Sequence, residues 1–235
     1  MKPLSFTTAS CLNNLDGIVH GFFGRDSFQH ESQICEQFGL KADHFVKLQQ
    51  QHTATVHRVD HPVAALPIGD GLVTAQPGLA LFILSADCVP VLLADPVKKL
   101  VAAAHAGWRG AVKGILESTV EEMKHLGSNP ADIKAALGPC IWQESYEIGP
   151  DVLNLMKDYP GSFHSDFLKP SPKPDHFYFD LPGYVAYRLK QAKVGCVEPS
   201  AFNTYDHPDR FISYRYETSR HLPAKERQAS VIFLK

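Results

Sequence analysis

Three apolar runs follow one another in the middle of the chain, and they constrain the fold more than any other feature. They are residues 79–87 (LALFILSAD), 89–95 (VPVLLAD) and 99–107 (KLVAAAHAG). Such continuous runs are typical of strands that are covered on both faces of a sheet. Between the second and third runs lies DPVKK, which begins with Asp-Pro, a dipeptide that favours turns. The pattern therefore predicts a buried hairpin.

This hairpin would bring Cys88 and His105 together. Positions at nearly equal distance from the turn of a hairpin face each other, and these two residues are nearly equidistant from a turn centred near Val97. A thiolate and a neutral imidazole are good ligands for a first-row metal. An imidazole can also deprotonate a thiol to make a nucleophile. A cysteine can equally serve as a small buried apolar residue, so the pattern alone leaves these alternatives open.

The rest of the chain predicts a mixture of helices and strands. Helical spacing of apolar residues, with capping and stop signals, predicts helices at residues 30–40, 111–127, 149–158 and 181–192, the last capped by Asp180. Apolar and β-branched runs predict strands at residues 17–23, 46–59 (one strand or two), 133–140, 211–217 and 230–235. Residues 68–78 are expected to be a turn-rich connection, and residues 160–180 a Pro-rich loop. We find no internal repeat or linker, and therefore expect one α+β catalytic domain over residues 1–235.

Composition and charge exclude several classes of protein. The formal charge of −2 over 235 residues gives no electrostatic reason to expect nucleic acid or an acidic membrane as a partner. The five cysteines are scattered without CxxC spacing, which is typical of free thiols in a reducing compartment. Neither a secretory signal nor a run of about 20 apolar residues is present. We expect a cytoplasmic protein, and favour a monomer.

Histidines between residues 52 and 61 form a further candidate group. In a strand, His52 and His57 would point to opposite faces, whereas His57 and His61 would share one. A single site could therefore take only one of His52 and His57.

Two glycine-flanked arginines are candidate anion ligands. Arg109 follows His105 in the segment HAGWRG, just before the predicted helix. A helix N-terminus with an arginine beside it suits phosphate or another anion, although the arginine can also simply brace the turn. Arg25 occupies a similar place in HGFFGRD. The roles of Asp70 and Asp87 are also left open by the sequence. An aspartate near a strand end can orient a ligand or cap a turn.

A series of motifs along the chain resembles a known family. In order, these are QQQH, GDGLVT, SADCVPVLLAD, AAAHAGWRG, ALGPCI, SYEIGPDV and FISYR. The series resembles the YfiH-type polyphenol oxidoreductase (laccase-like) family, whose members are now described as purine nucleoside phosphorylases. The resemblance extends from about His20 to the C-terminus and is most specific at ADCVP and HAGWRG. It implies an α+β fold layered α/β/β/α with mixed sheets, like that of the cysteine hydrolases.

The resemblance also implies a zinc-type metal site. Its three ligands correspond to His52, Cys88 and His105 in this sequence. His52, and not His57, would then enter the site. Laccase chemistry would require several copper sites, which three ligands cannot supply, so copper is less expected than zinc.

The implied activity is phosphorolysis of adenosine, inosine and guanosine to a free base and ribose 1-phosphate. Cleavage of methylthioadenosine and deamination of adenosine are also implied, since zinc can activate water for attack on adenine C6. For the catalytic roles we name Arg25 and Arg109, which would bind phosphate, and Asp87.

Two positions depart from the family pattern. Two other functions also compete with the implied phosphorylase activity. The segment after Arg25 is short, and Asn203 stands where a cysteine is common; substrate preference is therefore left open. One alternative is a cysteine hydrolase or amidase that acts on a cell-wall precursor, with Cys88 as nucleophile and His105 as base. The other is a non-catalytic metal or nucleotide sensor that uses the same pocket.

Overall fold

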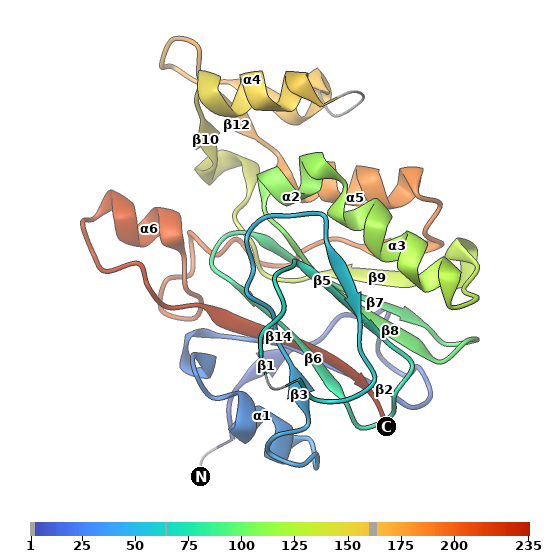
Figure 1. The fold of residues 1–235 in the computed structure, drawn as a ribbon. Coiled ribbons are helices and arrows are strands. Elements are labelled where there is room, and N and C mark those ends of the chain that lie inside the picture. Colours follow the sequence, from blue (N-terminus) through green and yellow to red (C-terminus); the bar gives the residue numbers. More distant parts are fainter. Residues whose placement is uncertain (1–2, 64, 160–163) are drawn as a thin grey trace.

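A computed structural model of the protein describes residues 3–63, 65–159 and 164–235. Two large β-sheets pack face to face, and helices cover their outer faces (Figure 1). This is a layered α+β architecture with mixed sheets, as expected. The five-stranded sheet consists, in order, of β1 (Phe6–Thr7), β2 (Ile18–Phe23), β14 (Gln228–Leu234), β6 (Ala80–Ser85) and β3 (Phe45–Val46).

The six-stranded sheet contains the predicted hairpin. Its strands, in order, are β13 (Cys196–Glu198), β9 (Lys134–Leu137), β7 (Val89–Asp95), β8 (Leu100–Ala106), β5 (Gly71–Thr74) and β4 (Val56–Arg58). β7 and β8 are antiparallel, with Pro90 opposite His105. The turn forms because the Asp95 side chain accepts hydrogen bonds from the backbone N–H groups of Val97 (2.8 Å) and Lys98 (2.9 Å). The hairpin prediction is therefore confirmed.

Alternate residues of the hairpin enter two different cores, which explains why both strands are apolar throughout. One set packs against helices, and includes Val91, Leu93, Ala102 and Ala104. The other packs against the five-stranded sheet, and includes Leu92, Ala94, Val101 and Ala103. All of these side chains are fully buried. The strand ends that carry Cys88 and His105 are thus fixed by packing on both sides.

Helices complete the outer layers. α2 (Trp108–Lys113), α3 (Ile115–His125) and α5 (Leu181–Gln191) pack on the six-stranded sheet, and α1 (Glu31–Gln37) packs on the five-stranded sheet. α4 (Pro150–Asp158) and a small sheet of β10 (Glu147–Ile148), β12 (Phe177–Phe179) and β11 (Leu168–Pro170) project beyond them, and α6 (Tyr214–Ser219) lies to one side (Figure 1). The described residues also form four 3-10 turns: η1 (Arg25–Ser27), η2 (Pro130–Asp132), η3 (Gln143–Ser145) and η4 (Ser165–Phe167).

Most predicted helices are confirmed, but the helix expected at residues 111–127 is divided. It forms α2 and α3, which are separated by Gly114 in the left-handed conformation (φ +98°). A glycine adopts this conformation without steric cost, and it ends the first helix. The Asp180 cap is confirmed, since its side chain accepts a hydrogen bond from the Gly183 N–H (2.9 Å).

Four segments differ from the prediction. Residues 46–59 contain the last residue of β3 and the whole of β4, with a loop between them. Residues 211–217 are not a strand but lead into α6, because the Ser213 side chain caps a helix by accepting from the Tyr216 N–H (3.1 Å). The connection at residues 68–78 contains β5. The Pro-rich segment contains η4, β11 and β12, while its residues 160–163 lie outside the described residues.

The described part of the chain contains no helix that is long and apolar enough to cross a membrane. All five cysteines are free thiols.

A buried histidine in the five-stranded sheet makes stability depend on pH. His20 is 4 % exposed, and its Nε2 accepts a hydrogen bond from the Ala9 N–H (2.8 Å). Burial lowers the pKa of His20 from 6.5 to about 4, against the opposing charge of Glu198. A lowered histidine pKa gives stability that is complete above pH 6.5 and is lost as the pH falls towards 4.

We therefore expect the free energy of unfolding to fall between pH 6.5 and 4, with about 3 kcal/mol of this loss due to His20. The His20→Gln variant keeps an acceptor but does not titrate, so its pH dependence should be correspondingly weaker. Denaturant unfolding at several pH values, with a metal chelator present, measures this. Identical pH profiles for the variant and the wild type would contradict it.

Candidate metal centre and adjoining cavity

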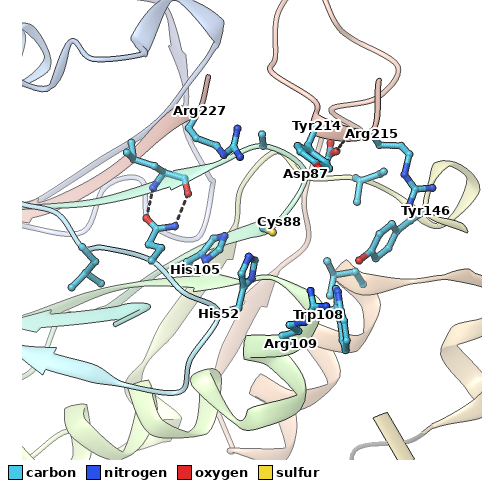
Figure 2. Close-up of a pocket in the computed structure, with 16 residues that line it drawn as sticks. His52, Asp87, Cys88, His105, Trp108, Arg109, Tyr146, Tyr214, Arg215 and Arg227 are labelled. Atoms are coloured by element: carbon cyan, nitrogen blue, oxygen red, sulfur yellow. Dashed lines mark hydrogen bonds between the residues drawn. The ribbon is translucent and has the colours of Figure 1, made fainter. Parts of the chain in front are cut away.

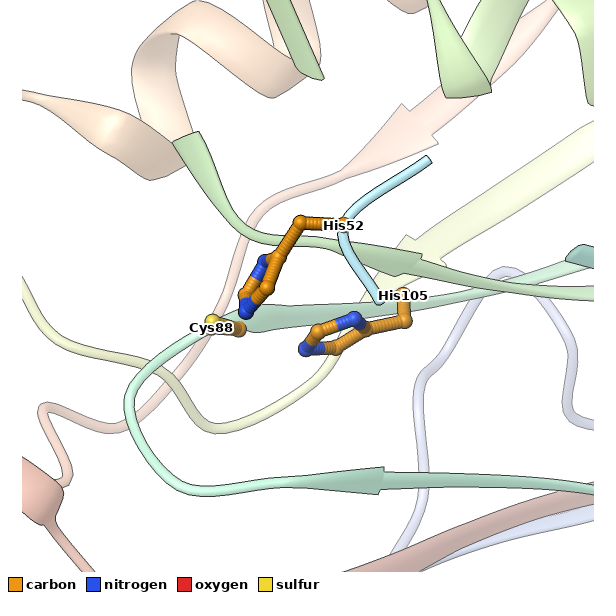
Figure 3. Close-up of side chains that lie close together, drawn as sticks. All are labelled: His52, Cys88 and His105. Atoms are coloured by element: carbon orange, nitrogen blue, oxygen red, sulfur yellow. The ribbon is translucent and has the colours of Figure 1, made fainter. Parts of the chain in front are cut away.

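The side chains of His52, Cys88 and His105 lie together at one end of the six-stranded sheet (Figure 3). Their potential ligand atoms all lie within 4.8 Å of one another. Among the residues that the structure describes, this is the one group of three or more His, Cys, Asp or Glu side chains that is arranged to hold a metal. The group predicted from the sequence is therefore brought together by the fold.

Each of the three side chains comes from a different local structure. Cys88 lies between β6 and β7, and His105 lies near the end of β8, so the hairpin sets their separation. His52 lies in the loop before β4, with φ +56°. Gly107 permits the close approach of all three, because a Cβ there would overlap the His52 ring and lie 2.9 Å from Cys88 Sγ.

His52 and not His57 belongs to the site, but not because of the strand alternation expected from the sequence. The alternation of a strand does not apply, since His52 is not in one. The two histidines are separated instead by the loop: His57 Nε2 forms a hydrogen bond with the Ile68 carbonyl oxygen (2.8 Å). His57 and the exposed His61, which pairs with Asp60, are thus engaged elsewhere.

Asp70 holds the ring of His105. Its Oδ1 accepts a hydrogen bond from His105 Nδ1 (2.8 Å), and the Asp70 side chain is fully buried. Burial alone would lower the pKa of His105, but the Cys88 thiolate and the Asp70 carboxylate raise it to about 9. Burial likewise opposes ionisation of Asp70, whereas hydrogen bonds from His105 and Thr53 lower its pKa to about 2. Asp70 is therefore ionised at neutral pH.

His52 has the opposite electrostatic environment. Burial and the neighbouring His105 lower the pKa of His52 to about 4, so its ring is neutral at pH 7. Its Nδ1 is buried and has no hydrogen-bond partner among the described residues. The neutral imidazole of His52, the sulfur of Cys88 and the imidazole of His105, which would give up a proton when a metal binds, form a donor set that suits Zn²⁺, and three protein ligands would leave a fourth position open. The residues present therefore fit a metal ion.

A cavity of about 620 Å³ adjoins the three side chains (Figure 2). Volumes of this size are typical of sites for small organic ligands. Its lining includes the aromatic residues Trp108, Tyr146 and Tyr214, together with apolar residues such as Leu48, Ile141 and Leu181. Burial raises the pKa of Tyr146 above its usual range, so its hydroxyl stays protonated. The cavity thus presents flat apolar surfaces next to the metal ligands.

Three arginines, Arg109, Arg215 and Arg227, make the cavity strongly basic. The Arg109 guanidinium lies 4.3 Å from the centre of the Trp108 ring, and it forms no ion pair with any described carboxylate. Arg215 donates to the Glu147 carbonyl oxygen (2.8 Å). Asp87 is the one acidic residue among the described residues of the lining. This excess of positive charge suits an anionic ligand.

Asp87 is engaged within the wall of the cavity. Its Oδ1 accepts from the Thr204 hydroxyl (2.6 Å), and its Oδ2 accepts from the Arg215 N–H (2.7 Å). Asp87 is 8 % exposed and adopts φ +81°. Burial raises its pKa, and the hydrogen bonds from Thr204 and Arg215 act in the opposite direction. These contacts connect the residue before Cys88 to the first turn of α6.

The structure does not bring Arg25 into the lining of this cavity. Arg25 lines a second, separate cavity, where its guanidinium forms ion pairs with Glu217 (3.2 Å) and Glu226 (3.6 Å). Its Nε donates to the Pro208 carbonyl oxygen (3.1 Å). Of the two arginines that the sequence predicted to bind phosphate, Arg109 is in the cavity, and the role of Arg25 stays a prediction.

Several residues of the site were missed or undervalued in the sequence. Arg215 ends the motif FISYR, but neither Arg215 nor Arg227 has the flanking glycines that single out Arg25 and Arg109 in the sequence. Asn203, which departs from the family pattern, accepts from the Trp142 N–H (3.1 Å) and donates to Ser145 (3.1 Å), next to the cavity. The sequence leaves Asp70 open between a turn and a ligand-orienting role, and its signals are the flanking glycines and the family motif GDGLVT.

Comparison with solved structures supports this fold. The structure of the hypothetical protein YfiH of Bacillus licheniformis matches with a TM-score of 0.86 and 26% sequence identity, and each chain is covered over its full length. The fold is therefore YfiH-like, whereas the predicted likeness to cysteine hydrolases is not confirmed.

Sequence comparison gives the family. A purine nucleoside phosphorylase of Rickettsia conorii is 32% identical over 223 residues, which cover 92% of this chain and 91% of the relative. A purine nucleoside phosphorylase of Rickettsia prowazekii is 33% identical over 83% of this chain and 80% of the relative. Residues 27–235 match the family model described as multi-copper polyphenol oxidoreductase laccase. The chain therefore belongs to this laccase-like YfiH family, in which curated relatives are named purine nucleoside phosphorylases.

Proposed function

We propose that this chain is a zinc-dependent purine nucleoside phosphorylase, and that residues 1–235 act as one catalytic domain. The observation that carries the proposal is the position of His52, Cys88 and His105 beside a basic, aromatic-lined cavity. The names of the relatives agree with it. We further propose a cytoplasmic location and a monomeric state, as expected from the sequence.

The proposed metal is zinc, and His52, Cys88 and His105 would hold it. Nitrogen and thiolate donors are typical of zinc sites, and three protein ligands are typical of catalytic ones. When bound, zinc would act as a Lewis acid that stabilises negative charge developing in the reaction. Only one candidate group is present in the described part of the chain, and laccase chemistry requires several copper sites. We therefore do not propose copper oxidase activity, despite the family's description.

The proposed reaction transfers a ribosyl group to phosphate. A phosphate oxygen forms a bond to C1′ of the ribose, and the bond from C1′ to the purine nitrogen breaks. The purine leaves with the electron pair and takes up a proton. This reaction requires an anionic phosphate beside the sugar, and the cationic groups of Arg109, Arg215 and Arg227 would bind it. Asp87 would position the wall that carries Arg215 rather than contact the substrate.

The aromatic and apolar lining would hold the purine. Trp108, Tyr146 and Tyr214 offer faces on which a base can stack. From the family resemblance we propose adenosine, inosine, guanosine and methylthioadenosine as substrates, and deamination of adenosine as a side activity. Formation of inosine from adenosine without phosphate tests the deaminase activity separately.

The central test is release of hypoxanthine from inosine by the purified, zinc-loaded chain, with and without phosphate. The proposal predicts release only with phosphate, together with an equal amount of ribose 1-phosphate. Release of hypoxanthine that does not depend on phosphate would indicate a nucleoside hydrolase instead. Absence of turnover with every purine nucleoside, combined with retained zinc or nucleoside binding, would favour the sensor.

Replacing Arg109 with alanine tests the phosphate site. Because this guanidinium lines the cavity and pairs with none of the described carboxylates, we expect the KM for phosphate to rise by about 10- to 100-fold, as for loss of a charge-assisted hydrogen bond of about 1.5–3 kcal/mol. The KM for inosine should change much less. Arg25→Ala is measured in the same way, because the sequence also predicts that Arg25 binds phosphate, although Arg25 pairs with Glu217 and lies outside the lining of this cavity. An unchanged KM for phosphate in Arg109→Ala would contradict the assignment.

A cysteine hydrolase is the second candidate, and one contact favours it. Cys88, His105 and Asp70 form a series of thiol, imidazole and carboxylate, in which Asp70 orients His105. In such a hydrolase, Cys88 would be the nucleophile, His105 the base and Asp70 the residue that orients the base. The substrate would be an amide such as a cell-wall precursor. Alkylation distinguishes the two functions. A zinc-bound thiolate should resist iodoacetamide until a chelator is added, whereas a catalytic thiolate should react equally fast with and without the chelator.

A further inference from the structure

A single buried carboxylate touches two of the three candidate metal ligands. Asp70 Oδ1 accepts hydrogen bonds from His105 Nδ1 (2.8 Å) and from the backbone N–H of His52 (3.1 Å). Its Oδ2 accepts from the N–H groups of Gln51 (3.2 Å) and Thr53 (2.6 Å) and from the Thr53 hydroxyl (2.8 Å). Five donors thus converge on a side chain that is fully buried.

The contacts of Asp70 explain the unusual conformation of the loop. His52 has φ +56°, a region that is unfavourable for residues other than glycine. Three successive backbone N–H groups, of Gln51, His52 and Thr53, point to the same carboxylate. Successive N–H groups that converge in this way form a binding site for an anion, and here the anion belongs to the protein itself. The carboxylate therefore stabilises the loop in the conformation that points His52 at Cys88.

Asp70 also determines which nitrogen of His105 is available. An ionised carboxylate accepts hydrogen bonds and donates none, so His105 Nδ1 must carry the hydrogen. In the neutral ring, Nε2 then has a free lone pair, which a metal ligand requires. The His105 backbone is held as well, because its N–H donates to the Asp70 carbonyl oxygen (2.7 Å).

The glycines on both sides of Asp70 allow the loop to approach it. A Cβ at position 69 would lie 2.9 Å from the His57 ring, and one at position 71 would lie 2.8 Å from a Val56 methyl group. The backbone N–H groups of Asp70 and Gly71 both donate to the Thr55 carbonyl oxygen (3.0 and 3.1 Å). The motif GDG thus brings the 51–55 loop down on the carboxylate.

We propose that Asp70 is the positioning residue of the metal centre: one carboxylate fixes the His52 loop and the His105 ring so that both are oriented for metal before it binds. This inference rests on the metal centre of the proposed function. It does not involve contact between Asp70 and the substrate. One side chain would thus orient two metal ligands, His52 and His105, that lie far apart in the sequence.

The test compares Asp70→Asn with Asp95→Asn in the full-length protein. Asparagine has nearly the same shape, but its amide group cannot accept all five hydrogen bonds. Asp95 is a matched control because it is equally buried and accepts from the backbone N–H groups of Val97 and Lys98, at the turn of the β7–β8 hairpin and away from the metal ligands. Zinc affinity is measured by competition with a chromophoric chelator, on protein that circular dichroism shows to be folded.

We expect Asp70→Asn to weaken zinc binding by about 10- to 100-fold, as for other groups that orient metal ligands. Asp95→Asn should lose stability but keep wild-type affinity. In the metal-free protein, amide hydrogen exchange at residues 51–53 should accelerate in Asp70→Asn beyond any global change, and not in Asp95→Asn. With Co²⁺ in place of zinc, the thiolate charge-transfer band should persist at saturation, because the groups that donate hydrogen bonds to Asp70 in the described residues do not include Cys88.

Zinc affinity of Asp70→Asn within twofold of the wild type would overturn the inference. If this variant does not fold, Thr53→Val decides, because it removes one donor to Asp70 and leaves the carboxylate in place; the inference predicts a loss of about two- to tenfold, and an unchanged affinity would overturn it. Failure of the wild type itself to bind zinc or Co²⁺ would instead contradict the proposed metal centre.

Discussion

Replacing Cys88 with alanine is expected to abolish zinc binding at physiological concentrations and to reduce phosphorolysis of inosine by more than about 100-fold. The thiolate is the one anionic ligand of the group, and alanine offers no donor in its place. Removing a metal ligand should lower zinc affinity more than removing a residue that only orients a ligand. For such orienting residues, losses of about 10- to 100-fold in affinity or activity are typical. Zinc content after dialysis and the initial rate with inosine and phosphate measure the two effects.

Cys196→Ala is the control for this substitution. Cys196 is also a half-buried free thiol, but it lies in β13, at the edge of the six-stranded sheet. This variant should keep its zinc and its activity. If Cys88→Ala kept one zinc per chain at wild-type affinity, Cys88 would not be a ligand. If it lost zinc but kept full activity, the metal would not serve the reaction.

Replacing Gly107 with alanine is expected to have a comparable effect without removing any ligand. The new methyl group would overlap the His52 ring and lie 2.9 Å from Cys88 Sγ, closer than side-chain atoms normally approach. His52 would have to leave its position, because Gly107 lies between Ala106, which is paired in the hairpin, and the first residue of α2. We expect a fall in zinc affinity and in phosphorolysis of more than about 10-fold, in line with losses caused by misplaced ligands.

Gly110→Ala provides a closely matched comparison. Gly110 lies three residues further on, within α2, and its nearest neighbour would be the Thr53 carbonyl oxygen at 3.3 Å. Alanine also favours a helix over glycine by about 1 kcal/mol, which offsets a small rearrangement. This variant should fold and bind zinc nearly as the wild type does. Equal zinc affinity in Gly107→Ala and Gly110→Ala would show that the crowding at Gly107 does not control the site.

The hairpin and one half of the site were predictable from the sequence because they depend on local patterns. Apolar runs on both sides of an Asp-Pro turn fix the pairing of β7 with β8, and this pairing alone brings Cys88 near His105. The third ligand could not be derived in this way. His52 lies in a loop whose conformation depends on Asp70, a residue far from it in the sequence, and only the family resemblance pointed to it.

The same distinction explains the errors in the secondary structure. Residues 211–217 have the apolar and aromatic composition of a strand, but the Ser213 cap and the contact of Asp87 with Arg215 favour the helix α6. Single-residue patterns do not contain such tertiary contacts. Arg215 therefore enters the cavity from a segment whose predicted structure was wrong. By contrast, Arg109 was predictable because it follows directly on His105.

Activity of the metal-free protein during titration with zinc tests the central claim most directly. The chain is treated with a chelator, dialysed, and assayed for hypoxanthine release from inosine as zinc is added, in parallel with and without phosphate. The proposed metal centre and function predict no release at zero zinc, a linear rise that stops at one zinc per chain, and no release without phosphate at any zinc level. Full phosphate-dependent activity of the metal-free protein would contradict the role of His52, Cys88 and His105 as the metal centre of a phosphorylase.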